Sequence, residues 1–180
     1  GVPQLAPDAS RRRAPFPLTE IQQAYWVGRQ GSFAMGNVSA HGYLEIEARG
    51  ADLPRLERAF NRVIARHDML RAVVQSDGNQ RILADVPYYR FKVEDLSALP
   101  PAERGARLAA LREELSHQVL PADIWPLFEI RASRLPEGVL RLHLSLDVLI
   151  LDAHSFDLIS ADWQHYHDHP DHELPPLAFS

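Results

Sequence analysis

The stretch that decides the fold is VLRLHLSLDVLILDAHSF, residues 139–156. Leucine occupies every second position in its first half, and polar residues stand between the leucines. This period of two is typical of a strand with one apolar face and one polar face. The polar positions are Arg141, His143, Ser145 and Asp147. Such a face predicts that the strand borders water, a partner or a polar cavity on that side.

The residues on either side of this strand extend the prediction. FEIRASRL at 128–135 and the turn Pro-Glu-Gly at 136–138 predict a hairpin with the strand. After Asp147 the alternation stops, and the apolar run 148–151 predicts a segment that is buried on both sides. We predict a helix over 155–167, directly after this run.

Caps and periodicity predict the remaining elements. Thr19 and Gln22 form a capping box that predicts a helix from about Glu20. Asp52 is the predicted N-cap of a second helix with an apolar stripe, and Pro100-Pro101 begins a third helix. That third helix is predicted over 101–120, and further strands are predicted over 37–48, 71–76, 80–84 and 88–96. The strands 71–76 and 80–84 are predicted to form a hairpin around the turn Asp77-Gly78-Asn79. Strands, hairpins and helices in this mixture predict an α+β (mixed α/β) fold.

Composition narrows the possible classes of protein. The chain has 180 residues, of which 46% are hydrophobic and 24% charged, an ordinary balance for one globular domain with a core. A net charge of −5 argues against a nucleic-acid binder, and the arginines at 11–13 are interpreted as part of a solvated leader. Cysteine is absent, which excludes disulfides, thiolate metal sites and a Cys nucleophile, and is consistent with a cytoplasmic protein. No apolar span reaches the length of a membrane helix, so no membrane partner is expected.

Two aspartates, Asp147 and Asp152, flank the apolar run 148–151, and Ser155 follows them. A buried charge costs several kcal/mol unless it is paired or neutralised. Asp152 or Ser155 could be the N-cap of the helix 155–167, and Asp147 could be a surface strand residue. An acid–base pair needs carboxylates that face each other, which this spacing does not establish. A functional site and a structural role therefore both remain open from the residues alone.

Three segments, in order along the chain, resemble the heterocyclization domains of nonribosomal peptide synthetases, in the condensation-domain superfamily. FPLTEIQQAYWVGR at 16–29 is similar to the family's opening motif, FPL[TS]xxQxAYxxGR. RHDMLR at 66–71 resembles the second motif, RHxMLR, and Asp147, Asp152 and Ser155 fit the motif DxxxxDxxS. The ending LPPLAFS resembles the stretch that closes the family's N-terminal lobe.

One position departs from the ordinary condensation domains of the superfamily, which carry HHxxxDG. When the shared aspartate is aligned on Asp152, Asp147 takes the place of the first histidine and Val148 that of the second, the usual catalytic candidate. A valine cannot accept a proton. The resemblance therefore implies a heterocyclizing domain rather than one that uses the condensation histidine.

The resemblance implies a fold similar to chloramphenicol acetyltransferase, with two lobes and a tunnel between them. Residues 15–174 would form the N-terminal lobe, with a mixed sheet flanked by helices. Residues 1–14 would be a flexible leader, and 175–180 the start of the inter-lobe linker. Residues proposed for cyclodehydration in this family would lie in the other lobe, so the isolated lobe is expected to be inactive.

The implied reaction joins a carrier-bound acyl or peptidyl thioester to a carrier-bound Cys, Ser or Thr and then cyclises the product to a thiazoline or oxazoline. The implied partners are the C-terminal lobe and the upstream and downstream peptidyl carrier proteins. Substrates would arrive on phosphopantetheine arms, with no cofactor bound directly. Two alternatives stay open: a non-catalytic module that docks carrier proteins, and an ordinary condensation domain.

The resemblance also implies roles for single residues. Asp147, Asp152 and Ser155 would form the catalytic motif, with Ser155 otherwise a helix cap. Asp152 would pair with Arg71, which together with His67 would give structural support.

Tyr25, Arg29 and His143 are candidates for the substrate tunnel. His67 is otherwise interpreted as a satisfied core histidine. His165 and His169 have a spacing compatible with zinc, but their acidic, terminal context favours a solvated helix end, and no metal site is predicted.

Overall fold

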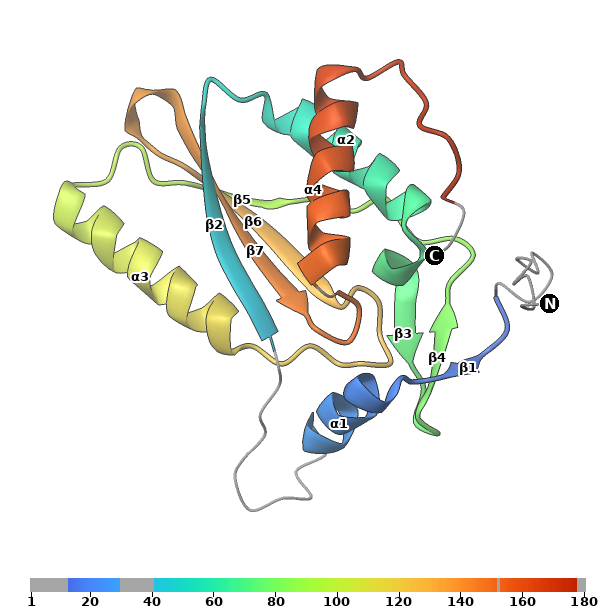
Figure 1. Ribbon diagram of the computed structural model, residues 1–180. Helices are drawn as coiled ribbons and strands as arrows, with labels where there is room; N and C mark the ends of the chain where they lie inside the picture. The colour runs from blue at the N-terminus through green and yellow to red at the C-terminus, as the bar shows by residue number, and fades with distance from the viewer. Residues whose placement is uncertain (1–12, 30–40, 152, 178–180) are drawn as a thin grey trace.

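The computed structural model describes residues 13–29, 41–151 and 153–177. Within these ranges the chain forms two sheets and the helices that cover them (Figure 1). In chain order the elements are β1 (Phe16–Pro17), α1 (Glu20–Arg29), β2 (His41–Arg49), α2 (Leu53–Arg66), a 3₁₀ turn (Asp68–Arg71), β3 (Ala72–Val74), β4 (Asn79–Ile82), β5 (Lys92–Asp95), α3 (Pro101–His117), β6 (Phe128–Arg134), a short 3₁₀ turn (Pro136–Gly138), β7 (Val139–Asp147) and α4 (Ala153–Asp168).

The larger sheet has the strand order β2-β7-β6-β5. Its pairs β2–β7 and β6–β7 are antiparallel, whereas β5 and β6 run parallel. Helix α3 covers one face of this sheet, and α2 and α4 cover the other (Figure 1). The smaller sheet has the order β1-β4-β3. This arrangement confirms the predicted α+β fold with a mixed sheet flanked by helices.

The core lies between the leucine face of β7 and the helices α2 and α4. The leucines at 140, 142, 144 and 146 are all buried. Phe60 of α2 is at the centre, with its ring centroid 5.5 Å from Phe128 and 4.8 Å from Trp163. Helix α2 begins at the predicted cap, because the Asp52 carboxylate accepts a hydrogen bond from the Arg55 amide at 3.1 Å.

The two hairpins that the sequence predicts are present. In the first, β6 pairs with β7 from Phe128 opposite Leu146 to Arg134 opposite Leu140. Its turn takes the left-handed conformation at Gly138, with φ 70°, a conformation that glycine adopts at little cost. In the second hairpin, β3 pairs with β4.

Four predicted elements are shorter in the structure than the sequence predicted. The strands predicted over 71–76 and 80–84 are Ala72–Val74 and Asn79–Ile82. The strand predicted over 88–96 is wrong in its first half, because the amides of Tyr89 and Phe91 donate to the Asn61 and Glu57 side chains of α2 and not to a neighbouring strand. The helix predicted over 101–120 ends at residue 117. Of the strand predicted over 37–48, residues 37–40 lie outside the described ranges.

The polar face of β7 differs most from the prediction. His143 and Ser145 have no exposed surface and Asp147 has 1%, because α3 packs over this side of the sheet. Ser145 Oγ donates to the Leu115 carbonyl of α3 at 3.0 Å. The expectation that this face borders water, a partner or a polar cavity is therefore wrong for His143 and Ser145. These side chains form a buried polar layer between the sheet and α3.

The irregular segment after α4 is held against α2. Arg62 donates to the carbonyls of Pro170 and His172, at 2.5 and 2.7 Å, and its guanidinium lies 4.0 Å from the centre of the Tyr166 ring. Arg66 donates to the Pro175 carbonyl. The residues that follow α4 are thus held against α2 through their main-chain carbonyls, as far as Pro175, the first residue of the predicted linker.

Candidate functional site

Asp147 shapes the turn between β7 and α4. Its side-chain Oδ1 accepts a hydrogen bond from the Leu149 amide at 2.9 Å, and its carbonyl accepts one from the Ile150 amide at 3.2 Å. Its own amide donates to the Leu127 carbonyl at 3.0 Å. This is an Asx-type turn, in which an aspartate replaces a backbone acceptor. One carboxylate oxygen of Asp147 is therefore committed to the turn.

The opening motif holds the same turn from the other side. The predicted capping box is present, since the Gln22 amide donates to Thr19 Oγ1 at 3.2 Å and the Thr19 amide donates to Gln22 Oε1 at 3.0 Å. Gln22 Nε2 also donates to the Leu149 carbonyl at 2.7 Å. The amide of Leu149 is therefore held by Asp147 and its carbonyl by Gln22. The first and third motifs, 127 residues apart at this contact, converge on one residue.

A small cavity of about 230 Å³ opens beside this turn. Asp147 and Val148 line it at the end of β7, and Leu151 and Phe156 line it from the α4 side. Gly42, Tyr43, Leu44 and Leu146 complete the lining. Apart from the Asp147 carboxylate and the Tyr43 hydroxyl, the residues that line this cavity carry apolar side chains.

Ser155 does not cap its helix. Helix α4 begins at Ala153, so Ser155 lies in the first turn, and the prediction of a helix that starts at residue 155 is wrong. The helix therefore begins two residues earlier than the sequence predicted. Asp152 lies outside the described residues, and so does the predicted pair of Asp152 with Arg71.

Arg71 is enclosed by partners from several segments. Its Nη2 donates to Asp68 Oδ1 at 2.6 Å; Asp68 is buried, and 11% of the Arg71 side chain is exposed. The same guanidinium donates to the carbonyls of Ile64, Leu83 and Ala84, at 3.2, 2.6 and 3.3 Å. Arg71 therefore ties the end of α2 to the segment after β4, which is a structural role.

His67 is the satisfied core histidine that the sequence analysis considered. It is buried, and its Nε2 lies 2.7 Å from Oδ2 of Asp162 in α4. Arg66 donates to the same oxygen at 2.8 Å. The second motif therefore joins α2 to α4 through one carboxylate. Tyr25 and Arg29 lie on α1, but the placement of their side chains falls outside the described part of the structure.

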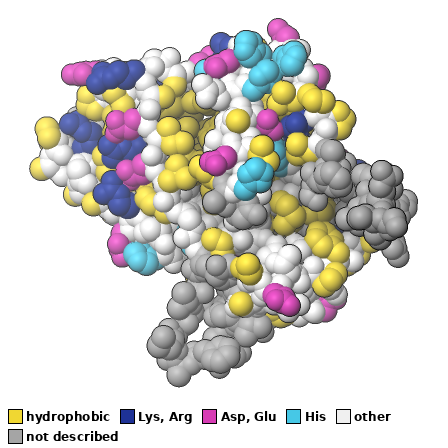
Figure 2. Space-filling view, in the orientation of Figure 1, with side chains coloured by type: hydrophobic (Ala, Val, Ile, Leu, Met, Phe, Trp, Pro, Cys, Tyr) yellow, Lys and Arg dark blue, Asp and Glu magenta, His cyan; other side chains and the backbone are white. Residues whose placement is uncertain are grey.

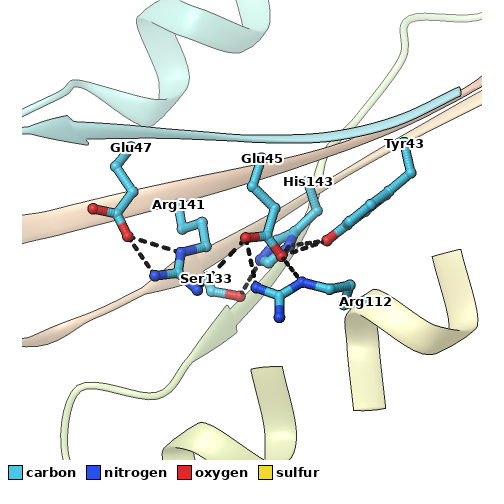
Figure 3. Close-up of polar contacts among 7 residues, drawn as sticks. All are labelled: Tyr43, Glu45, Glu47, Arg112, Ser133, Arg141 and His143. Atoms are coloured by element: carbon cyan, nitrogen blue, oxygen red, sulfur yellow. Dashed lines mark hydrogen bonds and ion pairs between the residues drawn. The ribbon is translucent and has the colours of Figure 1, made fainter. Parts of the chain in front are cut away.

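His143 lies in a closed polar network under α3 and not in the cavity (Figure 3). Glu45 is ionised and can only accept, so the Tyr43 hydroxyl donates to Glu45 at 2.7 Å. The Tyr43 oxygen then accepts from His143 Nδ1 at 3.0 Å, and His143 Nε2 accepts from the Ser133 hydroxyl at 2.9 Å. Arg112 of α3 closes the network with two bonds to Glu45, at 3.0 and 2.9 Å.

The electrostatics of this network favour a neutral imidazole. Burial lowers the pKa of His143 to about 4, although nearby Glu45 opposes the shift. Hydrogen bonding from Arg112 lowers the pKa of Glu45, and burial raises the pKa of Tyr43. A hydrolytic triad also combines a serine, a histidine and a carboxylate, but here Tyr43 stands between His143 and Glu45, and Ser133 has no exposed surface that a substrate could reach. The expectation that His143 lines a tunnel is wrong in this structure, because α3 covers the face of the sheet on which His143 lies.

The partners of His143 in this network could not be predicted from the sequence. Tyr43, Glu45 and Glu47 alternate with apolar residues, which placed them on one face of a strand. Their register opposite Ser145, His143 and Arg141 is a long-range property of the fold. No sequence pattern distinguishes Arg112 from other helix residues, because exposed arginines on helices are common.

The surface carries two further features, a group of histidines and an apolar groove. Histidine side chains gather at the C-terminal end of α4 (Figure 2), where His165 Nε2 lies 2.7 Å from His172 Nδ1. Among the described residues, no group of three or more His, Asp or Glu side chains is placed to hold a metal ion. An apolar groove of about 510 Å³ runs between the sheet and α4, where hydrophobic side chains gather in Figure 2. Within the described ranges no helix is long and apolar enough to span a bilayer.

Comparison with known proteins places the chain in a family. The family model described as "Condensation domain" matches residues 13–177. Bacitracin synthase 1 of Bacillus licheniformis is 33% identical over 165 residues, which cover 92% of this chain and 3% of that protein. Phenyloxazoline synthase MbtB of Mycobacterium sp. (strain MCS) is 41% identical over 150 residues, which cover 83% of this chain and 12% of that protein.

A solved structure agrees with these sequence relatives. The cyclization-docking bidomain of the nonribosomal peptide synthetase EpoB from Sorangium cellulosum superimposes with a TM-score of 0.91 at 39% identity, over 98% of this chain and 35% of that one. The chain thus spans a small part of its curated relatives and about a third of the solved bidomain. Its fold is the chloramphenicol acetyltransferase-like fold of those proteins, as predicted. The chain belongs to the condensation-domain family of nonribosomal peptide synthetases.

Proposed function

We propose that this chain is the N-terminal lobe of a heterocyclization domain. The complete domain would join a carrier-bound acyl or peptidyl thioester to a carrier-bound Cys, Ser or Thr and then expel water to give a thiazoline or oxazoline. The observation that carries the proposal is Val148, beside Asp147 in the cavity wall, where a condensation domain would carry its histidine. The relatives named phenyloxazoline synthase and cyclization bidomain support the same assignment.

The geometry supports catalysis by positioning. A correctly held pair of reactants can gain about 7–11 kcal/mol of the barrier from orientation alone. In this lobe the Leu149 peptide is held at both its amide and its carbonyl, which fixes the wall of the cavity. Asp147 is the charged residue in the described lining of this cavity, and we assign its carboxylate the role of orienting a substrate. The C-terminal lobe would supply the opposite wall and the cyclodehydration residues.

The partners of the complete domain follow from this proposal. Both substrates would be delivered on phosphopantetheine arms by an upstream and a downstream carrier protein. The cavity of about 230 Å³ is lined mainly by apolar side chains, which suits the uncharged end of a thioester arm better than a charged ligand. The lobe alone would be inactive, because half of the tunnel wall belongs to the other lobe.

The test is a reaction with the complete domain and both loaded carrier proteins. Mass spectrometry of the carrier-bound product would show an amide and then a loss of about 18 Da when the ring closes with expulsion of water. Amide without ring would identify an ordinary condensation domain. Neither product, with carrier binding retained, would identify a docking module. Either result would overturn the proposal.

A matched pair of variants separates the two roles of Asp147. Asp147→Asn keeps a side-chain oxygen for the Leu149 amide and removes the charge, whereas Asp147→Ala removes both. We expect Asp147→Asn to keep the bond to the Leu149 amide and to lose ring formation, because the negative charge of the carboxylate orients the substrate. Full ring formation by Asp147→Asn would show that the residue acts only through the turn.

A further inference from the structure

The motifs assign no role to His41, yet the fold brings it to the site. His41 is the first residue of β2 and pairs directly with Asp147, the last residue of β7. Residues directly opposite in an antiparallel pair point to the same face, with Cβ atoms about 4.5–5.5 Å apart. The His41 ring therefore lies on the Asp147 side of the sheet, although 106 positions separate the two residues in the numbering.

His41 contacts a buried hub formed by Ser145. The Ser145 side chain has no exposed surface, and its Oγ lies within hydrogen-bond distance of His41 Nε2. The same hydroxyl accepts from Gln118 Nε2 at 2.7 Å and lies 3.0 Å from the Leu115 carbonyl. The hub thus joins β2, β7, the end of α3 and the segment that follows it.

The hydrogen-bond donors and acceptors around Ser145 determine which ring nitrogen of His41 carries the proton. A serine hydroxyl has one proton to donate and two lone pairs to accept with. A carbonyl cannot donate, so the proton of Ser145 is directed at Leu115 and the hydroxyl accepts from its other neighbours. His41 Nε2 therefore carries the proton and donates it to Ser145. His41 and Gln118 are the two donors that hold this hydroxyl.

The hub lies two positions before Asp147, on the same face of the same strand. Asp147 in turn holds the Leu149 amide and thereby the cavity wall. We propose that His41 is a positioning residue for this site: its Nε2–H donates to Ser145 and fixes the end of β7, so that Asp147 keeps the turn in place. The catalytic part of this inference rests on the proposed function, whereas its structural part does not.

Two substitutions test the donor geometry. In His41→Gln the side-chain amide nitrogen reaches about as far as Nε2, whereas in His41→Asn it reaches only about as far as Nδ1. We expect Gln to replace the bond to Ser145 and Asn to lose it. His117→Asn is the matched control, because His117 lies at the end of α3 with 70% of its side chain exposed.

Hydrogen exchange measures positioning without any activity. The readout is the exchange of the Asp147, Leu149 and Ile150 amides, which are bonded within or next to the turn. Loss of a hydrogen bond worth about 1 kcal/mol predicts roughly fivefold faster exchange in His41→Asn. His41→Gln and the control should stay close to wild type. Unchanged exchange in His41→Asn, or equal acceleration in His41→Gln, would overturn the proposal.

Ring formation by the complete domain gives the second readout. A misplaced site costs on the order of 10–100-fold in rate, so His41→Asn should lower kcat by that factor with KM for the carrier substrate unchanged. His41→Gln should restore the rate, and adding His41→Asn to Ser145→Ala should cost nothing further. Additive losses would contradict action through Ser145. If the wild-type domain forms no ring, the proposed function fails, whereas the exchange data still decide the role of His41.

Discussion

Acid should weaken this fold through one buried imidazole, His143. Its pKa is lowered from an ordinary value of 6.5 to about 4, because burial disfavours the charged ring. Between these two values the unfolded chain binds a proton that the folded chain excludes. The stability that depends on neutral His143 is therefore fully present above about pH 6.5 and is lost as the pH falls towards about 4.

The size of this loss follows from the same two values. One pKa unit corresponds to about 1.4 kcal/mol, so acidification from about pH 7.5 to about pH 5 should remove roughly 2 kcal/mol of unfolding free energy through His143. Glu45 does not cancel the effect, because hydrogen bonding from Arg112 lowers its pKa and keeps it ionised over this range. In the neutral ring Nδ1 donates to Tyr43 and Nε2 accepts from Ser133.

The assay is urea unfolding followed by tryptophan fluorescence at several pH values, for wild type and for His143→Gln. Glutamine does not titrate, so the variant should lose about 2 kcal/mol less than wild type over the same range. At neutral pH the variant is expected to be less stable by about 1–3 kcal/mol, because the network loses a bond, so the slopes are compared and not the absolute values. Every other residue is the same in the two proteins. Parallel slopes would refute the assignment.

Three further predictions concern contacts between the motifs. Gln22→Leu should lower the unfolding free energy by about 1 kcal/mol and raise proteolysis of the 148–151 turn, because the Leu149 carbonyl loses its donor. Asp162→Ala should cost about 1–3 kcal/mol in urea unfolding, since it leaves buried His67 and half-buried Arg66 without their shared carboxylate. Val148→Ala should keep ring formation by the complete domain within about threefold of wild type, because valine transfers no proton; a loss of the ring but not of the amide would contradict this.

Local patterns predicted the elements of this fold well, because the interactions that form them are local. The capping box at Thr19 and the cap at Asp52 each involve a bond across three positions, which a sequence displays directly. The hairpin of β6 and β7 follows from alternation and one turn. The strand predicted over 88–96 failed for the opposite reason: Asn61 and Glu57, some thirty positions away, take the amides that a neighbouring strand would have used.

The candidate site shows the same division between what is local and what is not. A period of two showed that His143 and Asp147 share a polar face, but it could not show what covers that face. Helix α3 covers it, and so His143 becomes part of the buried layer while Asp147, at the strand end, still reaches the cavity. Motif spacing likewise selected Asp147 and Gln22 without relating them. The fold relates them at Leu149, whose amide one holds and whose carbonyl the other holds. Both motif residues therefore act on the cavity wall at Val148, and under the proposed function a site without the condensation histidine would still depend on its aspartate and its glutamine.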